Sequence, residues 1–314
     1  MANTSHRLPA PAGLLIDRSK PLAFSFEGKH YFGFQGDTIA SALAANGVWL
    51  LSRSFKYHRP RGILTMAGQD ANTLVQLPDE PNVRADRHPL SAGLRVMGQN
   101  YNGSLEHDRD RLNEKFARLL PVGFYYKAFF RPKGVWQKIW EPYFRKKAGL
   151  GKVNFNAHHG YYDKAYLFCD VAVVGGGPAG MAAALEAAQA GAEVILIEEN
   201  PILGGALCYA RFDTEGRRAA ELRQELTARV VAEKNIQVLA HAICNGWFAD
   251  NYLPVIQGKR LYKVRAQELV VASGMIEQPV AFRNNDLPGV MQASAAQRLI
   301  KLYGVKPGSQ AVVV

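Results

Sequence analysis

The hydrophobic pattern is most regular between residues 171 and 198. An apolar run, Val171–Val174, meets a glycine-rich turn, and an alanine-rich stretch follows it to about Gln189. A second apolar run, Val194–Ile197, ends on Glu198. Short apolar runs bounded by turn residues indicate buried strands, and an alanine-rich stretch of this length favours a helix. The pattern therefore predicts strand, turn, helix and strand, the opening unit of a doubly wound α/β domain.

Near the start of the chain, polar and apolar residues alternate with a period of two. Residues 20–35 alternate around Glu27-Gly28 and predict a β-hairpin. We expect Asp37 to cap a short helix over Thr38–Ala45, which Asn46-Gly47 ends. A hairpin followed by a packed helix is how a small β-grasp domain begins.

The second half of the chain continues the α/β pattern. A helix with interleaved charges is predicted over Glu215–Lys234. A turn at 306–309 precedes an apolar run that looks like the first half of a strand, so we expect the chain to be a fragment of a longer protein. The predicted further strands are Thr73–Leu77, Ile236–Ala240, Leu253–Gln257, Leu261–Ala266, Leu269–Ala272 and Gln310–Val314.

These elements predict an α/β chain in three parts. Residues 1–95 would form a ferredoxin-like β-grasp domain. Residues 169–314 would form a Rossmann-type dinucleotide-binding domain, of the type found in flavoproteins with two dinucleotide domains, that is truncated at its C-terminal end. The connecting residues, 96–168, are irregular and rich in aromatic side chains. Such a segment is expected to pack on a domain or on another subunit rather than to be disordered.

The glycine-rich turn predicts the chemistry of the second domain. Gly175 allows a tight turn, Gly177 leaves room for a diphosphate, and Gly180 lets the helix approach the sheet. The first amides of a helix lack partners, so they and the helix dipole attract an anion. Glu198 lies where a carboxylate can accept hydrogen bonds from both ribose hydroxyls of an adenosine, and it would repel a 2′-phosphate. The motif predicts NAD or FAD rather than NADP, against the alternative of a glycine turn that binds nothing.

Composition narrows the class of protein. The chain has 314 residues, 48% of them hydrophobic, and a mean hydropathy of -0.14, which leaves room for two domains with cores. No apolar run approaches the roughly 20 residues needed to span a bilayer, and the start lacks the pattern of a signal peptide. Cys169, Cys208 and Cys244 are few and widely spaced, so we expect no disulfide framework, no metal site and a cytoplasmic location.

The net charge of +11 is confined to one part of the chain. Residues 1–169 hold 24 Lys and Arg against 13 Asp and Glu, whereas residues 170–314 hold 14 of each. A basic half can indicate nucleic-acid binding, but the sequence has no recognised nucleic-acid motif or basic repeat. A partner subunit or a phosphate-bearing cofactor explains the excess at least as well, and we expect neither a nucleic acid nor a membrane as partner.

Some polar residues have both a functional and a structural interpretation. The basic residues of 53–61 could contact a flavin phosphate or an acidic partner surface, although a solvated loop is the simpler interpretation. Residues 284–289 are expected to form a tight turn, with a substrate role as the alternative. His88, His158 and His159 have no carboxylate or cysteine at ligand spacing, and we interpret them as surface or hydrogen-bonded histidines.

Four segments carry a family resemblance. They are RSFKYHRPRG (53–62), the aromatic-rich residues 121–151, the glycine-turn residues 169–200 and FRNNDLPGVMQASA (282–295). In these segments the chain closely resembles the N-terminal third of the alpha subunits of heterotetrameric sarcosine oxidases. The first two segments separate this family from general pyridine-nucleotide flavoproteins.

The resemblance implies that the chain is part of an amine-oxidising enzyme. Such an assembly demethylates sarcosine oxidatively to glycine, reduces O2 to H2O2, and transfers the one-carbon unit to tetrahydrofolate or releases it as formaldehyde. The resemblance places FAD and the amine-oxidising site on the beta subunit, with a covalent FMN at the alpha–beta interface. It places NAD on the alpha subunit, and gamma and delta subunits are further partners. It assigns no catalytic residue to this chain, and it puts the folate site beyond residue 314.

Carried onto this sequence, the resemblance assigns the NAD pyrophosphate to the glycine turn and the adenosine ribose to Glu198. Two short glycine-containing segments, one after each flanking strand, would complete the wall of the site. Because the motif fits both dinucleotides, the choice between NAD and FAD stays open. The candidate cofactor-binding residues are Gly175, Gly177, Pro178, Ala179, Gly180, Glu198, Glu199, Gly204, Gly205, Ser273 and Gly274.

Some relatives of this family carry a [2Fe–2S] cluster in the β-grasp domain. Plant-type ferredoxin spacing is C-x4-C-x2-C, and Thr65, Asp70 and Thr73 stand at that spacing here. Residues 1–168 contain no cysteine, and oxygen side chains do not hold iron against bridging sulfide as thiolates do. We therefore expect a β-grasp fold that has no iron–sulfur cluster.

Three functions remain open from the sequence. The first is an NAD-binding alpha subunit of a sarcosine-oxidase-type complex. The second is a subunit of a related N-methyl-amino-acid, amine or opine dehydrogenase, against which the absent cluster cysteines argue. The third is a non-catalytic docking module whose dinucleotide is structural.

Overall fold

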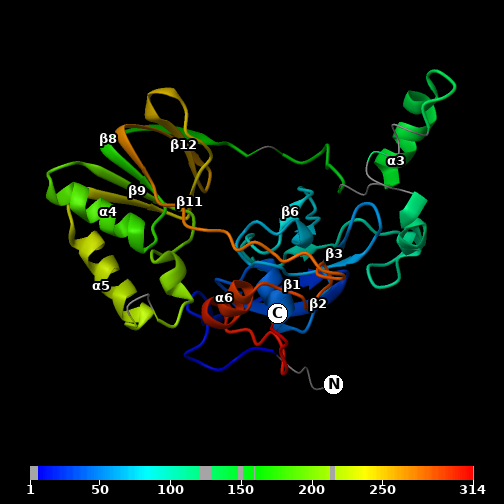
Figure 1. Cartoon of the computed structure of the whole chain (residues 1–314), viewed down its shortest axis with the longest axis horizontal. Helices are drawn as coiled ribbons and strands as arrows, with labels where there is room; N and C mark the ends of the chain where they lie inside the picture. Colours follow the sequence, from blue (N-terminus) through cyan, green and yellow to red (C-terminus); the bar gives the residue numbers. More distant parts are fainter. Residues whose placement is uncertain are drawn as a thin grey trace. The chain divides into compact units, whose positions relative to one another are not determined.

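The computed structural model describes residues 6–119, 123, 129–147, 151–158, 160–212 and 216–313 (Figure 1). The chain divides into two compact units, and each is described by itself. The first unit joins Met1–Ala157 to Glu277–Val314, and the second unit is His158–Ile276. His159, which the sequence predicts to be a surface or hydrogen-bonded histidine, lies outside the described residues.

These units differ from the three segments that the sequence predicts. The chain returns to the first unit after residue 276, so the predicted domain 169–314 is divided between the two units. The described part of segment 96–157 belongs to the first unit. Sequence alone does not reveal the return, because a glycine after a strand, such as Gly274, marks a turn but not the unit on which the following residues pack.

The first unit opens on the predicted hairpin. Strands β1 (Asp17–Phe26) and β2 (Lys29–Gln35) pair antiparallel around Glu27-Gly28. Strand β7 (Arg95–Val96) pairs parallel with the end of β1. Alternate residues of β1, such as Phe24, are buried because one face of the small sheet covers the core.

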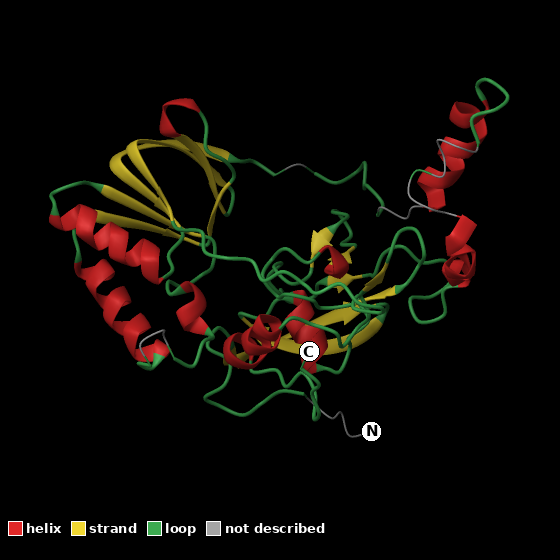
Figure 2. Cartoon of the chain, in the orientation of Figure 1, coloured by secondary structure: helices red, strands yellow, loops and turns green. Residues whose placement is uncertain are grey.

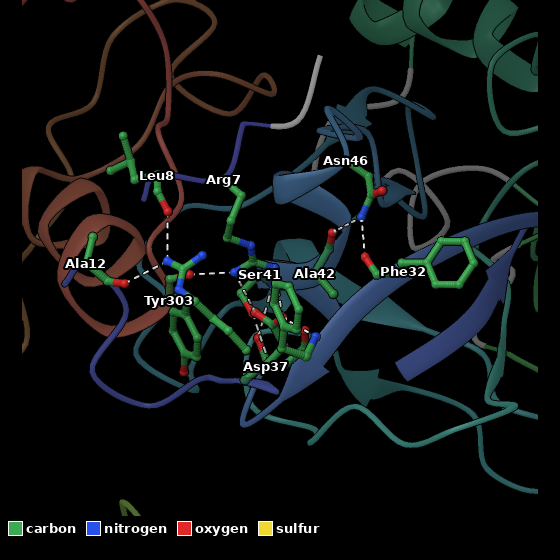
Figure 3. A network of polar contacts seen from close by, with 12 residues as sticks. Arg7, Leu8, Ala12, Phe32, Asp37, Ser41, Ala42, Asn46 and Tyr303 are labelled. Carbon is green, nitrogen blue, oxygen red and sulfur yellow. Dashed lines mark hydrogen bonds and ion pairs between the residues drawn. The ribbon is translucent and has the colours of Figure 1, made fainter. Parts of the chain in front are cut away.

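Helix α1 (Ile39–Ala45) is wholly buried, and its start corrects the predicted cap by one residue. Thr38 is the N-cap, and it exchanges hydrogen bonds with Ser41 in a capping box. Asp37 accepts from Ser41 Oγ at 2.7 Å and forms a buried ion pair with Arg7 at 2.8 Å (Figure 3). Asp37 therefore ties the beginning of the chain to the helix.

The last part of the chain packs on this same core. Helix α6 (Ala293–Tyr303), which the sequence pattern does not reveal, buries Leu299 and Tyr303 in the cluster that contains Phe24. Figure 3 shows the guanidinium of Arg7 between Asp37 and the backbone carbonyl of Tyr303. The predicted strand over 310–314 is wrong for residues 310–313, which form no strand.

Short elements complete the first unit. In the aromatic segment, the rings of Phe129, Trp136, Trp140 and Phe144 pack on one another. The predicted return strand 73–77 shortens to a two-residue strand. The elements are β3 (Ser52–Arg53), β4 (Pro60–Arg61), η1 (Ala71–Thr73), β5 (Leu74–Val75), β6 (Val83–Arg84), η2 (Arg109–Leu119), η3 (Trp136–Trp140) and α3 (Glu141–Lys147).

The second unit is built on one sheet of strand order β10-β9-β8-β13-β12-β11. Strands β8 (Asp163–Val174), β9 (Val194–Glu198) and β10 (Ile236–Ala240) are parallel, in the order 3-2-1 that Rossmann-like folds use. Helices α4 (Pro178–Gln189) and α5 (Ala219–Ala232) cover one face of these strands (Figure 2). The predicted strand, turn, helix and strand are confirmed.

The other half of the sheet is an antiparallel extension. Strands β11 (Ala242–Cys244), β12 (Tyr252–Gln257) and β13 (Arg260–Val271) follow one another, with η5 (Ala249–Asn251) before β12. The sequence predicts two strands where β13 is one, because β13 pairs parallel with β8 along its whole length. A second core, including Leu253, lies between this extension and the parallel strands.

Candidate functional site

The glycine turn joins β8 to α4. Gly175 has φ +111, a conformation that glycine adopts freely, and its N–H donates to the Ile197 carbonyl at 2.8 Å. A Cβ at Gly175 would lie 2.3 Å from the Ala272 carbonyl oxygen. Glycine at this position is therefore required both by the turn and by the neighbouring strand.

Gly180 and Gly177 occupy very different surroundings. A Cβ at Gly180 would lie 1.8 Å from the carbonyl oxygen of Gly175, so only glycine lets the first turn of α4 close on the loop. A Cβ at Gly177 would have no neighbour nearer than Gly205 Cα, at 3.9 Å. Gly177 is also the N-cap of α4, with Pro178 at the first helical position. The space beside Gly177 is open at a helix N-terminus, where an anion is favoured.

The carboxylate of Glu198 is buried behind the turn. One oxygen accepts from the Gly176 N–H at 2.7 Å. The other accepts from both the backbone N–H and the side-chain amide of Asn200, at 2.7 and 2.6 Å. Glu198 is only 4% exposed, so it fixes the end of β9 to the glycine turn. The sequence does not predict a role for Asn200, since no spacing rule distinguishes it from other loop residues.

The segment Gly204-Gly205 lies directly against the turn. Its first residue donates to the Gly176 carbonyl at 2.8 Å. Both glycines have positive φ, and a Cβ at Gly205 would lie 2.9 Å from Gly177 Cα. The 3₁₀ turn η4 (Gly205–Cys208) follows. The structure thus brings together two glycine segments whose contacting residues, Gly176 with Gly204 and Gly177 with Gly205, are 28 positions apart in the sequence.

The remaining predicted residues lie around this centre. Ala272 donates to the Val174 carbonyl at 2.8 Å, which holds the end of β13 beside the turn. Ser273 and Gly274 follow this strand end, and Glu199 is exposed beside Glu198. Ala179 lies in the first turn of α4. All the predicted positions therefore border one edge of the sheet.

Cys208 is the thiol nearest to this site. Burial raises its pKa to about 11, and its Sγ lies 3.5 Å from the Leu203 carbonyl. The thiol is protonated at neutral pH, so it does not supply a nucleophile. The site offers backbone amides, glycine surfaces and one carboxylate, which are groups that bind and orient a ligand.

The basic segment 53–61 is largely engaged within the first unit. Arg53 is buried and donates to backbone carbonyls, including that of Leu105 at 2.8 Å. Arg59 and Arg61 both pair with Asp286, whose pKa these guanidinium groups lower to about 2. Segment 284–289 is therefore a turn held by two arginines, and the interpretation of 53–61 as a simple solvated loop is wrong for these three cations.

The loop at the predicted cluster spacing is organised by a carboxylate. Asp70 is buried and accepts from the backbone N–H groups of Leu64 and Thr65 at 2.9 Å and of Met66 at 3.3 Å. Thr65 Oγ1 also donates to Asp70. The side chains of Thr65 and Asp70 are thus bonded to each other.

Two family models match the chain. Residues 19–101 match the 2Fe-2S iron-sulfur cluster binding domain, and residues 170–242 match the FAD dependent oxidoreductase family. Among solved structures, L-proline dehydrogenase from P. horikoshii has a TM-score of 0.67 at 24% identity, covering 96% of this chain and 50% of that one. These matches and the glycine turn define the class: an oxidoreductase chain with a dinucleotide-binding domain of the FAD-dependent type.

Curated relatives match nearly the whole of the chain. The chain is 40% identical to the sarcosine oxidase alpha subunit of Rhizobium meliloti (strain 1021) over 97% of its length, and 32% identical to that of Corynebacterium sp. (strain P-1) over 99%. It spans 32% and 30% of those relatives. One subunit of the opine oxidase of Agrobacterium tumefaciens (strain Ach5) is 31% identical over 47% of the chain and 32% of that relative. Over nearly its whole length the chain is similar to these sarcosine oxidase alpha subunits, and it spans about a third of their length.

The match over 19–101 corrects the predicted cofactor set. The expectation of no iron–sulfur cluster is contradicted, because the first domain matches a family defined by cluster binding. The cysteines of this chain, at 169, 208 and 244, lie outside the matched residues, so they do not fit a cluster there.

Proposed function

We propose that the second unit holds the ADP half of an adenine dinucleotide for an amine-oxidising complex. The observation that carries this proposal is the open space beside Gly177 at the N-terminus of α4. The first amides of a helix have no partner within it, so a diphosphate placed there gains both hydrogen bonds and a favourable dipole. A turn with a purely structural role would not need this opening.

The ribose would be bound at the end of β9. Glu198 is ionisable and acceptor-rich, and Asn200 holds its carboxylate in a fixed orientation. A fixed acid in this place favours a free 2′-hydroxyl and disfavours a 2′-phosphate. When bound, the dinucleotide supplies hydride-transfer chemistry. The residues of this chain bind and orient it.

Either FAD or NAD has this ADP half. The resemblance of the sequence favours NAD, and the match to the FAD dependent oxidoreductase family supports FAD. Both share the diphosphate and adenosine that the turn and Glu198 would contact. The choice depends on the ring beyond the diphosphate, which identification of the bound cofactor resolves.

We further propose that the complete protein acts on sarcosine. Two of its relatives are named as sarcosine oxidase alpha subunits, and their matches span nearly the whole of this chain. The proposed reaction is sarcosine + O2 + H2O → glycine + formaldehyde + H2O2, with transfer of the one-carbon unit to tetrahydrofolate as the alternative to free formaldehyde. The partners of this chain would be beta, gamma and delta subunits. The beta subunit would supply the amine-oxidising site, and the covalent FMN would lie at the alpha–beta interface.

The free cysteines favour a cytoplasmic setting. No helix of the described residues could cross a membrane.

The test uses the full-length protein with its neighbouring subunits. The cofactors released by denaturation are identified by chromatography and mass spectrometry, and the complex is mixed anaerobically with sarcosine. We expect one adenine dinucleotide per alpha chain and reduction of a bound cofactor by sarcosine. Reduction by an opine or by proline but not by sarcosine would favour the related dehydrogenases. A dinucleotide that sarcosine leaves unreduced would favour a docking module whose dinucleotide is structural. Recovery of no adenine dinucleotide would contradict the proposal.

A further inference from the structure

The outer face of the sheet extension in the second unit has an unusual set of side chains. Residues directly opposite each other on paired strands point to the same face. Tyr166 of β8 is opposite Lys263 of β13, and Phe168 is opposite Arg265. Arg265 is in turn opposite Tyr252 of β12. Two rows that cross these strands therefore place cations beside aromatic rings, and we name this surface the aromatic–cation face.

The contacts within this face agree with the register. The ammonium of Lys263 lies 4.9 Å from the Tyr166 ring centroid, and the guanidinium of Arg265 lies 5.4 Å from that of Tyr252. Tyr166 is 63% exposed and Phe168 is 72% exposed. The rings and the cations hold one another in place, so the face is preorganised and open.

The opposite face of the same strands is an ordinary core. Leu167, Cys169 and Val264 alternate with the residues of the aromatic–cation face and pack in the cluster with Leu253 and Val255. The face that a sheet exposes to water is normally polar. Contiguous exposed aromatic residues mark interaction sites, and aromatic residues with arginine are enriched in the cores of protein interfaces.

We infer that the aromatic–cation face is the docking surface for a partner subunit that presents carboxylates around an apolar centre. This inference rests on the proposed role of the chain as one subunit of a complex. Lys164, Lys263 and Arg265 give the face a positive character. An acid of this unit, Asp250, is 87% exposed and lies 3.5 Å from Arg265. A carboxylate of the partner would replace this exposed interaction with a desolvated one.

Charge argues for a different subunit rather than a second copy of this chain. In a two-fold symmetric dimer the same patch meets itself. Lys263 and Arg265 would then approach their own copies, and like charges across an interface cost several kcal/mol. An acidic partner has the complementary charge.

The experiment uses the full-length alpha chain and its partner subunits. K263E/R265E reverses the charge of the face, and the matched control R218E/R229E reverses two exposed cations on and beside α5. Association is measured by analytical ultracentrifugation, and exposure of Tyr166 and Phe168 by hydroxyl-radical footprinting. We expect K263E/R265E to weaken assembly at least about tenfold and the control less than about twofold. Oxidation of Tyr166 and Phe168 should fall on assembly.

If something other than a partner subunit covers the aromatic–cation face, the footprinting and assembly experiments give different results. Protection of Tyr166 and Phe168 in the isolated full-length alpha chain would show that the chain covers its own face. Protection on self-association would indicate a second copy, and binding of oligothymidine that K263E/R265E abolishes would indicate single-stranded nucleic acid. Each of these results overturns the inference, as does equal assembly of the two variants. The dinucleotide content of K263E/R265E should remain that of the wild type, which separates failure of this inference from failure of the proposed function.

Discussion

The backbone N–H groups of two loops in this chain have opposite surroundings. At the glycine turn of the second unit, the space beside Gly177 is open and contains no protein atom that would conflict with a Cβ. At the loop of the first unit, the carboxylate of Asp70 occupies the centre and accepts from the N–H groups of Leu64, Thr65 and Met66. One loop leaves open the space beside a helix N-terminus, and the other contains an anion of the protein.

The contrast shows how a loop can be recognised as a binding site. Glycine residues occur in both loops, so their presence alone does not distinguish them. What distinguishes them is the content of the space that the amides surround. A buried carboxylate that accepts several N–H groups stabilises a loop by itself. An open helix N-terminus gains the same stabilisation only when a ligand is bound.

The largest expected effect is at the closed side of the glycine turn. Gly180→Ala would place a Cβ 1.8 Å from the Gly175 carbonyl oxygen, a backbone atom that cannot move without opening the turn. We expect a loss of more than about 3 kcal/mol in the free energy of unfolding of the second unit. Thermal unfolding combined with limited proteolysis measures it. Unchanged unfolding would show that the turn has a different geometry.

Removal of the carboxylate in the other loop should have the next largest effect. Asp70→Ala leaves the buried N–H groups of Thr65 and Met66, and the partly buried N–H of Leu64, without their acceptor. The expected cost is about 3 kcal/mol, read from chemical denaturation of the purified chain. Asp79→Ala, an exposed acid on a nearby loop, is the matched control and should cost much less. Similar costs for the two variants would contradict the role of Asp70.

A second buried acid, Asp86, contacts this loop through the Gly68 N–H and should make stability depend on pH. Burial, aided by the charge of Asp70, raises the pKa of Asp86 from 3.8 to about 6. The folded protein binds the proton more tightly, so stability is lost as pH rises from about 4 to about 6. Asp86→Asn retains an acceptor for the Gly68 N–H and should be more stable than wild type by about 2 kcal/mol at pH 7.5. The difference should disappear below pH 4, and a difference independent of pH would refute this explanation.

The smallest predicted effect concerns the returning segment of the first unit. Asp286→Asn breaks the paired contacts to Arg59 and Arg61, which are partly exposed. We expect a loss of about 1 kcal/mol at pH 7. Because these cations lower the pKa of Asp286 from 3.8 to about 2, this stabilisation should fade as the pH falls from about 4 to about 2. The melting temperatures of the wild type and of Asp286→Asn, measured across that pH range, test this prediction.

The sequence predicts the elements whose periodicity is strong. The hairpin around Glu27-Gly28, helix α1 and the unit from β8 to β9 follow from alternation, capping residues and the glycine pattern. Local rules could not reveal that α6 packs on the first unit, since its buried residues find their partners almost 300 residues away. They also missed the continuity of β13, which depends on its pairing with β8.

The candidate site, like the fold, can be predicted only where a local sequence pattern marks it. Glycines have a local signature in the sequence, so the turn and Gly204-Gly205 could be found. The orientation of the Glu198 carboxylate toward Gly176 and Asn200 depends on where the loop after β9 folds, which no motif specifies. The aromatic–cation face likewise becomes visible only when the register of β8, β13 and β12 is known.

The most direct measurement compares two matched glycine substitutions in the second unit. Gly177→Val places a side chain in the open space beside α4, and Gly160→Val places the same side chain on an exposed segment with ordinary contacts. The content of adenine dinucleotide per alpha chain is determined after denaturation of each purified full-length complex. We predict that both variants form folded complexes and that Gly177→Val alone loses the dinucleotide, together with the thermal stability that the bound dinucleotide contributes. Retention of the dinucleotide by a folded Gly177→Val complex would contradict the assignment of this turn as the binding site.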